Sequence, residues 1–461
     1  MIAAIRREIK PMLALALPLV LAELGWMFMA VVDTIMVGHL PNPALTISAA
    51  ALAQVIYNTL AFGIGGVLLG LDTYISQSHG AGRLDDANRW LLHGLVLAAL
   101  LSALLMALVA AGPLALRHLP VDPAILTPAA AFLQALNPGT PPLLLYLTLR
   151  RYLQAFNHVR PIAVALVSAN VINALGDWIL LFPHHLAGVH FGGYGVTGAA
   201  WSTSIARLYL AGFLLVAIWH VNRKHGYGLR SVFARKRHHF ELWRLQRLAL
   251  LGAPVGGQIF VEISIFAAVT ALIGTLGPLP LAGHEIALNC ASVTFMVPFA
   301  ISAAAAVRVG QAIGRRSPEE AAAAGWTAIA LGAGFMLTAS AALLLLPHAI
   351  ARGFTADPAV IAAAVPLLLV AAAFQFFDGL QITATGALRG AGNTHAGLIV
   401  QVIGYWIVGL PVGVLLGYRF KLGAVGLWLG LCAGLIIAGV ALIATWRRTA
   451  RSIETYSVAS R

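Results

Sequence analysis

The apolar stretch LALALPLVLAELGWMFMAVVDT, residues 13–34, decides the fold because it is long enough to cross a membrane as a helix. A second stretch, LALLGAPVGGQIFVEISIFAAVT at 248–270, has a related pattern, and Pro18 corresponds to Pro254 at an offset of 236 residues. The segment at 13–34 carries Glu23 and Asp33 and has no small-residue cleavage site after it, so we interpret it as a span and not as a signal peptide. These stretches predict a polytopic membrane protein with an internal repeat.

The whole chain has this apolar character. Of its 461 residues, 60% are hydrophobic and only 10% are charged, so most of it cannot form a soluble surface. A spanning helix needs about 20 apolar residues. Segments of this kind are expected at 12–36, 45–72, 90–112, 124–149, 161–183, 194–220, 249–277, 280–307, 322–347, 358–388, 396–418 and 423–446. The expected fold class is an all-α polytopic membrane protein with twelve transmembrane helices.

Three further pairs of motifs extend the repeat along the chain at similar offsets. HGAGR (79–83) resembles VGQAIGRR (309–316), LRRYLQAFNHVRP (149–161) resembles ALRGAGNTHAG (387–397), and GVTGAAW (195–201) resembles GAVGLW (423–428). Six spans per copy predict two pseudo-symmetric six-helix bundles around a central cleft. The expected domains are an N-terminal lobe at 1–220, a basic cytoplasmic linker at 221–247 and a C-terminal lobe at 248–461.

The net charge of +13 reflects membrane topology. When alternate loops are assigned to the side of the two termini, that side collects 24 of the 29 Lys and Arg residues, against four on the other side. The positive-inside rule then places both termini in the cytoplasm. The basic excess therefore predicts contact with the lipid bilayer and no binding of nucleic acid.

Carboxylates inside the predicted spans are the candidate functional residues, because a charge near the bilayer centre costs a few kcal/mol. Asn173 and Asp177 are four residues apart and share one helix face, and with Asp33 they form a candidate site in the first half. Glu262 and Asp378 form a second candidate site in the other half. No Lys lies in a predicted span and Arg207 is the only Arg deep in one, so most of these acids lack an obvious ion-pair partner.

An unpaired buried carboxylate holds a proton or another cation. The two sites therefore predict coupling to H⁺ or Na⁺, and a negative cavity would also attract organic cations. The alternative is that these polar groups only lock helices together by hydrogen bonds.

Enzyme signatures are missing from the sequence. No lysine follows a glycine, which excludes a GxxxxGK phosphate loop. The two cysteines, Cys290 and Cys432, lie inside predicted spans, so we expect neither disulfides nor a thiolate metal site. We expect no enzymatic activity, no cofactor and no metal beyond a candidate Na⁺ site at the coupling residues.

Several strings together resemble the multidrug and toxic compound extrusion (MATE) transporters, in particular the NorM-like bacterial branch. They are VVDTIMVGHL (31–40), LDTYISQSHGAGR (71–83), LAGHEIALN (281–289), MVPFAISAAAAVRVGQAIG (296–314) and DGLQITATGALRGAGNTH (378–395). The resemblance covers nearly the whole chain. It implies a monomer in the bacterial inner membrane that exports organic cations in exchange for protons or sodium ions.

The resemblance also implies roles for individual residues. Its first-lobe site maps onto Asp33, Asn173 and Asp177, and its second-lobe acids map onto Glu262 and Asp378. Three further residues are candidate substrate or ion contacts: Thr197, Glu285 and Phe374. Family members can have a tyrosine where this chain has Phe374, which favours proton coupling, and Glu285 stands where a neutral amide is more typical.

The expected function is therefore secondary active multidrug export by alternating access. The nearest alternative is a lipid-linked oligosaccharide flippase of related architecture, which would need a cationic cleft. An intramembrane enzyme would need a nucleophile or metal constellation that the sequence lacks. A passive channel or scaffold would use the acids only for packing, and active efflux against a gradient would exclude it.

Overall fold

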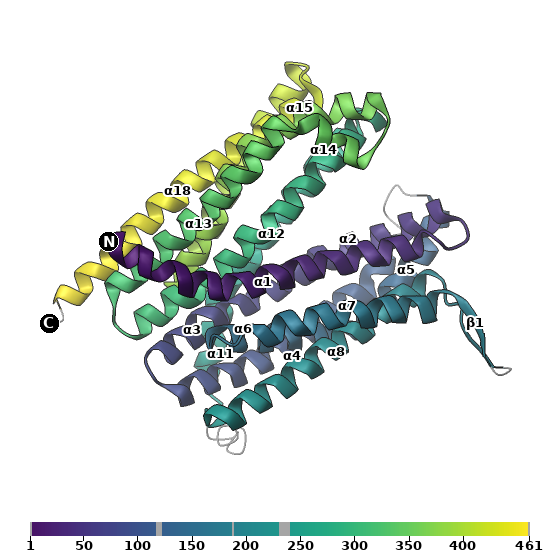
Figure 1. Ribbon diagram of the computed structural model, residues 1–461. Coiled ribbons are helices and arrows are strands. Elements are labelled where there is room, and N and C mark those ends of the chain that lie inside the picture. Colours follow the sequence, from purple (N-terminus) through teal and green to yellow (C-terminus); the bar gives the residue numbers. More distant parts are fainter. Residues whose placement is uncertain (1, 117–121, 187–188, 230–239, 460–461) are drawn as a thin grey trace. The chain divides into compact units, whose positions relative to one another are not determined.

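The computed structural model describes residues 2–116, 122–186, 189–229 and 240–459 (Figure 1). Within these ranges the chain is helical apart from one short β-hairpin. Eleven of the described helices are long and apolar enough to cross a membrane. Helices suit this environment because every backbone group in hydrocarbon needs a hydrogen-bond partner within the protein. The expected all-helical membrane fold is confirmed.

Proline starts many of the helices, where its missing N–H costs nothing. Asp122 caps one of these starts by accepting a hydrogen bond from the backbone N–H of Ala124. The first half of the chain contains α1 (Ile2–Val37), α2 (Pro43–Gly66), η1 (Val67–Leu69), α3 (Gly70–Gly80), α4 (Leu84–Leu116), α5 (Pro123–Leu136), η2 (Asn137–Gly139), α6 (Thr140–Ala155), α7 (Arg160–Leu181) and α8 (Val196–His225).

The second half is also helical, and Asp357 caps α15 through the N–H of Ala359 over 2.9 Å. Its elements are α11 (Leu242–Gly274), α12 (Pro278–Gly314), α13 (Pro318–Leu345), α14 (Pro347–Phe354), α15 (Pro358–Gly390), α16 (His395–Gln401), η3 (Val402–Gly409), α17 (Leu410–Val414), η4 (Leu415–Arg419) and α18 (Gly423–Ala459). The segments η3 and η4 are π-helical and lie on either side of Pro411 in α17. Proline removes a backbone donor from the helical ladder, and π-helical turns are frequent at functional sites.

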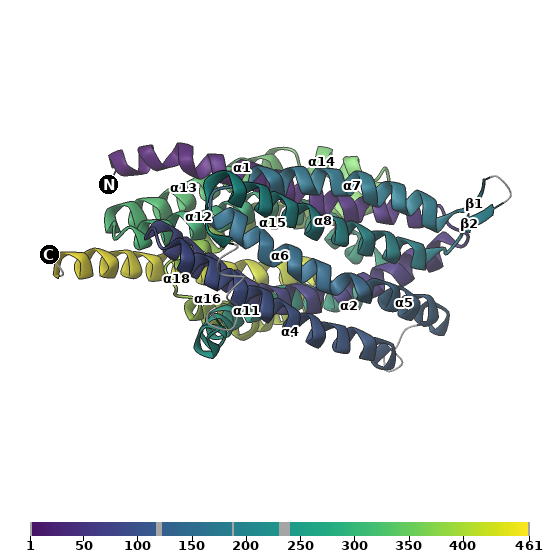
Figure 2. The same ribbon diagram turned by 90° about the horizontal axis from the view of Figure 1, so that it is seen from below.

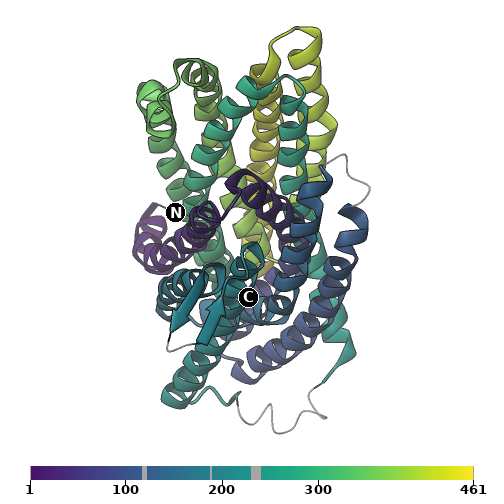
Figure 3. The same ribbon diagram turned by 90° about the vertical axis from the view of Figure 1, so that its right-hand side faces the viewer.

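Three local features differ from the expectation drawn from the sequence. The fourth expected span, 124–149, is formed by α5 and α6, which the 3-10 turn η2 around Pro138 separates. Helix α6 continues to Ala155, so Arg150 and Arg151 are buried helix residues and not residues of a cytoplasmic loop. Strands β1 (Pro183–Leu186) and β2 (Val189–Gly192) pair antiparallel between α7 and α8 (Figures 2 and 3).

The chain divides into two compact units. The N-terminal unit comprises Leu21–Leu71 and Leu84–Gly252, and the C-terminal unit comprises Met1–Val20, Asp72–Arg83 and Ala253–Arg461. Helices α1 and α11 each contribute residues to both units, and α3 belongs to the C-terminal unit from Asp72 onward although it follows α2 in sequence. Residues 230–239, in the expected basic linker, lie outside the described residues.

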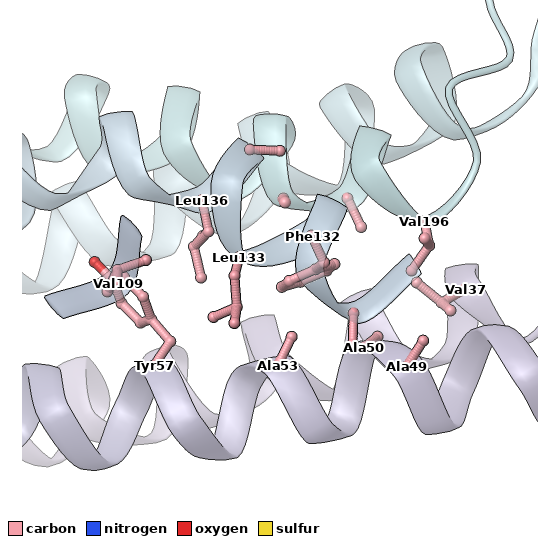
Figure 4. Packing of buried hydrophobic residues seen from close by; sticks show 14 of the residues in the cluster. Val37, Ala49, Ala50, Ala53, Tyr57, Val109, Phe132, Leu133, Leu136 and Val196 are labelled. Atoms are coloured by element: carbon pink, nitrogen blue, oxygen red, sulfur yellow. The ribbon is translucent and has the colours of Figure 1, made fainter. Parts of the chain in front are cut away.

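The core of the N-terminal unit lies between α2, α4, α5 and α8. Figure 4 shows Phe132, Leu133 and Leu136 of α5 facing Ala50, Ala53 and Tyr57 of α2. Small alanines on α2 leave room for the large side chains of α5, which is how helices pack closely in a membrane. Tyr57 is fully buried, so its hydroxyl needs a partner inside the unit.

The C-terminal unit packs α12, α13, α15 and α18 against one another (Figure 1). Helix α18 also packs on η3 and α17 through glycines. A Cβ atom on Gly430 would lie 2.3 Å from the Cα of Gly413, so only glycine allows the two backbones to come this close. A Cβ atom on Gly434 would likewise lie 2.4 Å from the backbone oxygen of Gly404 in η3, so α18 packs just as closely on η3, which carries one of the polar residues described below.

Candidate functional site

The first cluster of polar residues lies in the N-terminal unit. Helix α1 contributes Asp33, and α7 contributes Asn173 and Asp177, which are one turn apart on the same face. All three side chains are buried. Asp33 interacts with both Asn173 and Asp177, so the three residues that the sequence singled out in this half lie together.

Helix α8 supplies hydroxyl groups to this cluster. Thr203 Oγ1 donates to Asp33 Oδ2 over 3.2 Å. Ser202 Oγ donates to the backbone carbonyl of Asn173 over 2.8 Å and accepts from Asn173 Nδ2 over 3.2 Å. The Asn173 amide is thus oriented with its nitrogen toward α8, and Thr203 holds one oxygen of Asp33.

Four oxygens of the cluster have no hydrogen-bond partner in the part of the chain that the structure describes. Among the described residues, Asp33 Oδ1, Asn173 Oδ1 and both carboxyl oxygens of Asp177 have no hydrogen-bond partner. Carboxylates that lie together in a buried site cannot both remain charged at little cost. The arrangement can therefore hold a shared proton or a small cation between the two carboxyl groups.

A buried cation borders the first cluster. Arg207 follows Thr203 by one helical turn on α8 and interacts electrostatically with Asp33. Its Nη1 donates to Tyr57 Oη over 2.8 Å, and its guanidinium carbon lies 4.6 Å from the centre of the Tyr57 ring. The Tyr57 hydroxyl also lies 3.0 Å from Thr140 Oγ1. The charged guanidinium of Arg207 thus donates a hydrogen bond to a neutral hydroxyl group.

The second cluster lies in the C-terminal unit. Glu262 of α11 and Asp378 of α15, the two acids singled out in this half, interact electrostatically. Asp378 is buried and Glu262 is partly buried. Gln401 Nε2 at the end of α16 donates to Glu262 Oε2 over 3.4 Å. A carboxylate and an amide donor therefore meet where the α-helix changes into the π-helix η3.

Two more buried polar residues extend the second cluster. Tyr405 of η3 donates its hydroxyl proton to Gln381 Oε1 over 2.9 Å. Gln381 lies within reach of Glu262, and Tyr405 interacts with both acids of the cluster. In the part of the chain that the structure describes, Gln381 Nε2 and Gln401 Oε1 have no hydrogen-bond partner. The cluster thus offers both donors and acceptors beside its acids.

The three remaining candidates make other contacts in the structure. Phe374 is buried one turn before Asp378 and packs edge-to-face on Phe266, with ring centroids 6.0 Å apart. Thr197 donates to the carbonyl of Tyr194 over 2.7 Å, so the hydroxyl that serves Asp33 is that of Thr203. Glu285 is exposed on α12, and its backbone carbonyl accepts a hydrogen bond from the Asn289 side chain over 2.9 Å.

Two other acids form ion pairs inside the units. Glu23 of α1 pairs with Arg150 of α6, and both side chains are buried. Asp72 is fully buried, and its Oδ2 atom lies 3.4 Å from the Nε atom of Arg389. Asp72, in the first turn of α3, is therefore held in a buried ion pair.

Several residues of the two clusters escaped the sequence reasoning. The string STS at 202–204 and the amides of Gln381 and Gln401 are polar interruptions of apolar helices, and such interruptions could have indicated them. Their helices were expected, but which face of each helix meets the acids depends on packing.

Comparisons with known proteins show what this chain is similar to. The sequence model of the MatE family matches residues 18–179 and again residues 254–415. The two matches are 236 residues apart, the same offset that relates Pro18 to Pro254. The family model thus covers both halves of the chain.

Curated bacterial proteins are similar over almost the full length. The probable multidrug resistance protein NorM of Mesorhizobium japonicum is 35% identical over 97% of this chain and 95% of its own length. The multidrug resistance protein PmpM of Pseudomonas aeruginosa is 33% identical over 97% of this chain and 93% of its own length.

Solved structures share the fold. An outward-facing multidrug resistance MATE transporter superposes with a TM-score of 0.86 at 18% identity and covers 97% of this chain and 96% of that one. A transporter of the MOP superfamily from Pyrococcus furiosus, described as having a binding pocket of reverse polarity that suggests a different function, superposes equally well, with a TM-score of 0.86 at 17% identity over 97% of both chains. The fold alone therefore does not determine the substrate, and the charges of the site must be considered.

Proposed function

This chain belongs to the MatE family of membrane transporters and is not an enzyme, and from that premise we propose that it exports organic cations from a bacterial cell in exchange for protons. Its relatives named above are multidrug resistance proteins of bacteria. The proposed location is the bacterial inner membrane with both termini in the cytoplasm, as the distribution of Lys and Arg favours. The protein acts as a monomer in this proposal, and its surroundings are the lipid bilayer.

The observation that carries the proposal is the pair of carboxyl groups in the N-terminal unit. Asp33 and Asp177 interact, and three of their four oxygens have no hydrogen-bond partner among the described residues. Such a pair is costly in a membrane unless a proton or cation neutralises part of its charge. A bound proton that is released on one side of the membrane and regained on the other supplies the coupling.

Proton coupling is favoured over sodium coupling by the second cluster. Glu262 receives a hydrogen bond from an amide nitrogen of Gln401, and the Tyr405 hydroxyl donates to Gln381. The residue one turn before Asp378 is Phe374, which offers no oxygen and packs among aromatic rings. A sodium ion needs several oxygen ligands at once, whereas a proton needs only one carboxylate. Sodium coupling remains the alternative that the experiment below tests.

The substrate class follows from the sign of the charge. Both clusters are acidic, so a site near them attracts cations, whereas a lipid-linked oligosaccharide with its pyrophosphate would be repelled. Exposed aromatic residues in the predicted spans, such as Phe28 and Trp178, suit flat cationic compounds. The protein is therefore proposed to be an exporter and not a flippase.

Alternating access links the two events. Export is driven only if proton and drug have different affinities for the inward-facing and outward-facing states. In the proposed cycle, protonation of the clusters from outside favours drug release, and deprotonation toward the cytoplasm restores the site for the next cation. The two units, which share α1 and α11, are the bodies that move in this cycle.

The test is transport of ethidium in proteoliposomes under a pH gradient alone and under a sodium gradient alone. We expect accumulation with the pH gradient only, and loss of accumulation in Asp33→Asn and Asp378→Asn. Accumulation with the sodium gradient only would mean that the coupling ion is sodium and not the proton. Ethidium movement that needs neither gradient and survives both substitutions would contradict the antiporter proposal.

A further inference from the structure

Arg207 combines a buried charge with a neutral hydrogen-bond partner. Its side chain is only 4% exposed. A buried guanidinium without a paired carboxylate is costly, and in membrane segments such residues are rare and mark functional sites. Its Nη1 atom nevertheless donates to the hydroxyl of Tyr57, a neutral group, over 2.8 Å. In the described structure its Nε atom has no hydrogen-bond partner.

The side chain lies beside the first acidic cluster. Arg207 follows Thr203 by four residues, so both side chains project from the same face of α8. Thr203 donates to Asp33 Oδ2, and Arg207 interacts electrostatically with the same aspartate. Asp33 Oδ1 has no hydrogen-bond partner among the described residues. An unused acceptor of Asp33 and an unused donor of Arg207 therefore occur in one cluster.

The charges of the cluster add up to a simple balance. With Asp33 and Asp177 both ionised, Arg207 leaves one negative charge uncompensated, and one bound proton makes the cluster neutral. Without Arg207 the empty cluster would carry two negative charges in a low-dielectric site, and proton release would be opposed. The arginine therefore makes the deprotonated state accessible.

We propose that Arg207 is the internal counter-cation of the first coupling site and exchanges its hydrogen bond between Tyr57 and Asp33 during transport. While a proton sits on the carboxyl pair, Tyr57 holds the guanidinium. When the O–H bond breaks and the proton passes to cytoplasmic water, the guanidinium donates to the free oxygen of Asp33. Reprotonation of the carboxylate returns it to Tyr57.

The same charge selects the coupling ion. A proton is held covalently on a carboxyl oxygen, whereas a sodium ion would stay a full positive charge beside the guanidinium and be repelled. The first site therefore takes one proton per cycle and rejects sodium. This inference deepens the proposed function, because it rests on proton coupling at the Asp33 and Asp177 pair.

The alternative is a structural role, in which Arg207 only fastens α8 to α2 through Tyr57. The two roles predict different effects of two substitutions on the pH at which the carboxyl pair loses its proton. Arg207→Gln removes the charge, so the site should keep its proton to higher pH. Tyr57→Phe removes the hydroxyl and frees the guanidinium for Asp33, so the site should lose its proton at lower pH. A fastening role predicts loss of stability in both and no such opposite shifts.

The first measurement is independent of transport. Infrared difference spectra of the purified protein follow the C=O band of protonated carboxyl groups as the pH is changed, and Asp33→Asn and Asp177→Asn identify the band of the pair. We expect its midpoint to move up by about one pH unit or more in Arg207→Gln, to move down in Tyr57→Phe, and to stay near the wild type in Arg207→Lys. An unchanged midpoint in Arg207→Gln would overturn the proposal.

The second measurement is the transport assay described above with the same variants. Arg207→Gln should shift the pH profile of ethidium transport to higher pH and should acquire dependence on sodium. If wild-type protein accumulates no ethidium, the proposed function fails while the infrared midpoints still decide the role of Arg207. If wild type transports and Arg207→Gln keeps the wild-type pH profile and ignores sodium, only the counter-cation proposal fails.

Discussion

Thr203 Oγ1 donates a hydrogen bond to Asp33 Oδ2 over 3.2 Å and so joins α8 to α1 across 170 residues of sequence. The same hydroxyl also lies 3.0 Å from the carbonyl of Ala199 one turn earlier on α8. A threonine hydroxyl carries one proton, so its hydrogen bond to Asp33 competes with its bond to its own helix. The strength of this contact therefore depends on the charge of Asp33.

Thr203→Val removes the hydroxyl and keeps the shape of the side chain. A hydrogen bond to a charged group contributes about 1.5–3 kcal/mol, so we expect gradient-driven ethidium transport to fall by about ten-fold to a hundred-fold. Thr197→Val is the matched control, since the Thr197 hydroxyl donates to the carbonyl of Tyr194. Transport rates of the two variants in proteoliposomes check the prediction. Equal losses of transport in both variants would mean that any such change in α8 has this effect, and not specifically the loss of the hydrogen bond to Asp33.

Glu262 and Asp378 should act as one unit because they interact within the second cluster. We expect Glu262→Gln and Asp378→Asn each to reduce proton-driven transport strongly, and the double variant to be no worse than the more severe single variant. The measurement is a double-mutant cycle on initial transport rates. Glu319→Gln, at the exposed start of α13, serves as the control. Additive losses would mean that the two acids work independently.

The buried pair of Glu23 and Arg150 should matter for stability. Arg150→Met leaves Glu23 buried without its partner, which costs about 3–5 kcal/mol when such a pair is broken. The pair of Arg315 and Glu320 is 38% and 53% exposed, so Arg315→Met should cost at most about 1 kcal/mol. Thermal unfolding in detergent compares the two variants. The double variant Glu23→Gln/Arg150→Met should recover much of the loss, and similar destabilisation by all three variants would argue against a specific ion pair.

Two glycines of α13 should respond differently to alanine. A Cβ atom on Gly325 would lie 2.0 Å from Cζ2 of the Trp446 ring in α18, whereas a Cβ atom on Gly334 would have no atom within 4 Å. We expect Gly325→Ala to lower the free energy of unfolding by about 1–3 kcal/mol through overpacking. Gly334→Ala should leave it unchanged or raise it by up to about 1 kcal/mol. Thermal unfolding of the two variants side by side tests this, and an unchanged melting temperature in Gly325→Ala would contradict the close packing.

Much of the first cluster was predictable from the sequence. Asn173 and Asp177 share a face of any helix because they are four residues apart, and an acid inside a long apolar segment is too costly to occur without a role. Thr203 was not predictable in this way, because Thr197 lies on the same helix and only the packing of α8 decides which hydroxyl reaches Asp33. The partner of Glu23 was missed because α6 extends to Ala155 and takes Arg150 into its buried face.

The sequence by itself indicated the helical membrane fold, the internal repeat and the five polar residues that form the two buried clusters, since apolar length and the cost of buried charge act locally along the chain. The tertiary structure decided which groups meet: Thr203 with Asp33, Arg207 with Tyr57, Gln401 with Glu262 and Arg150 with Glu23. These contacts join helix faces that are distant in sequence. Which residues meet depends on how each helix is rotated about its axis and where it is interrupted. Side-chain packing sets both, and no local sequence pattern specifies them.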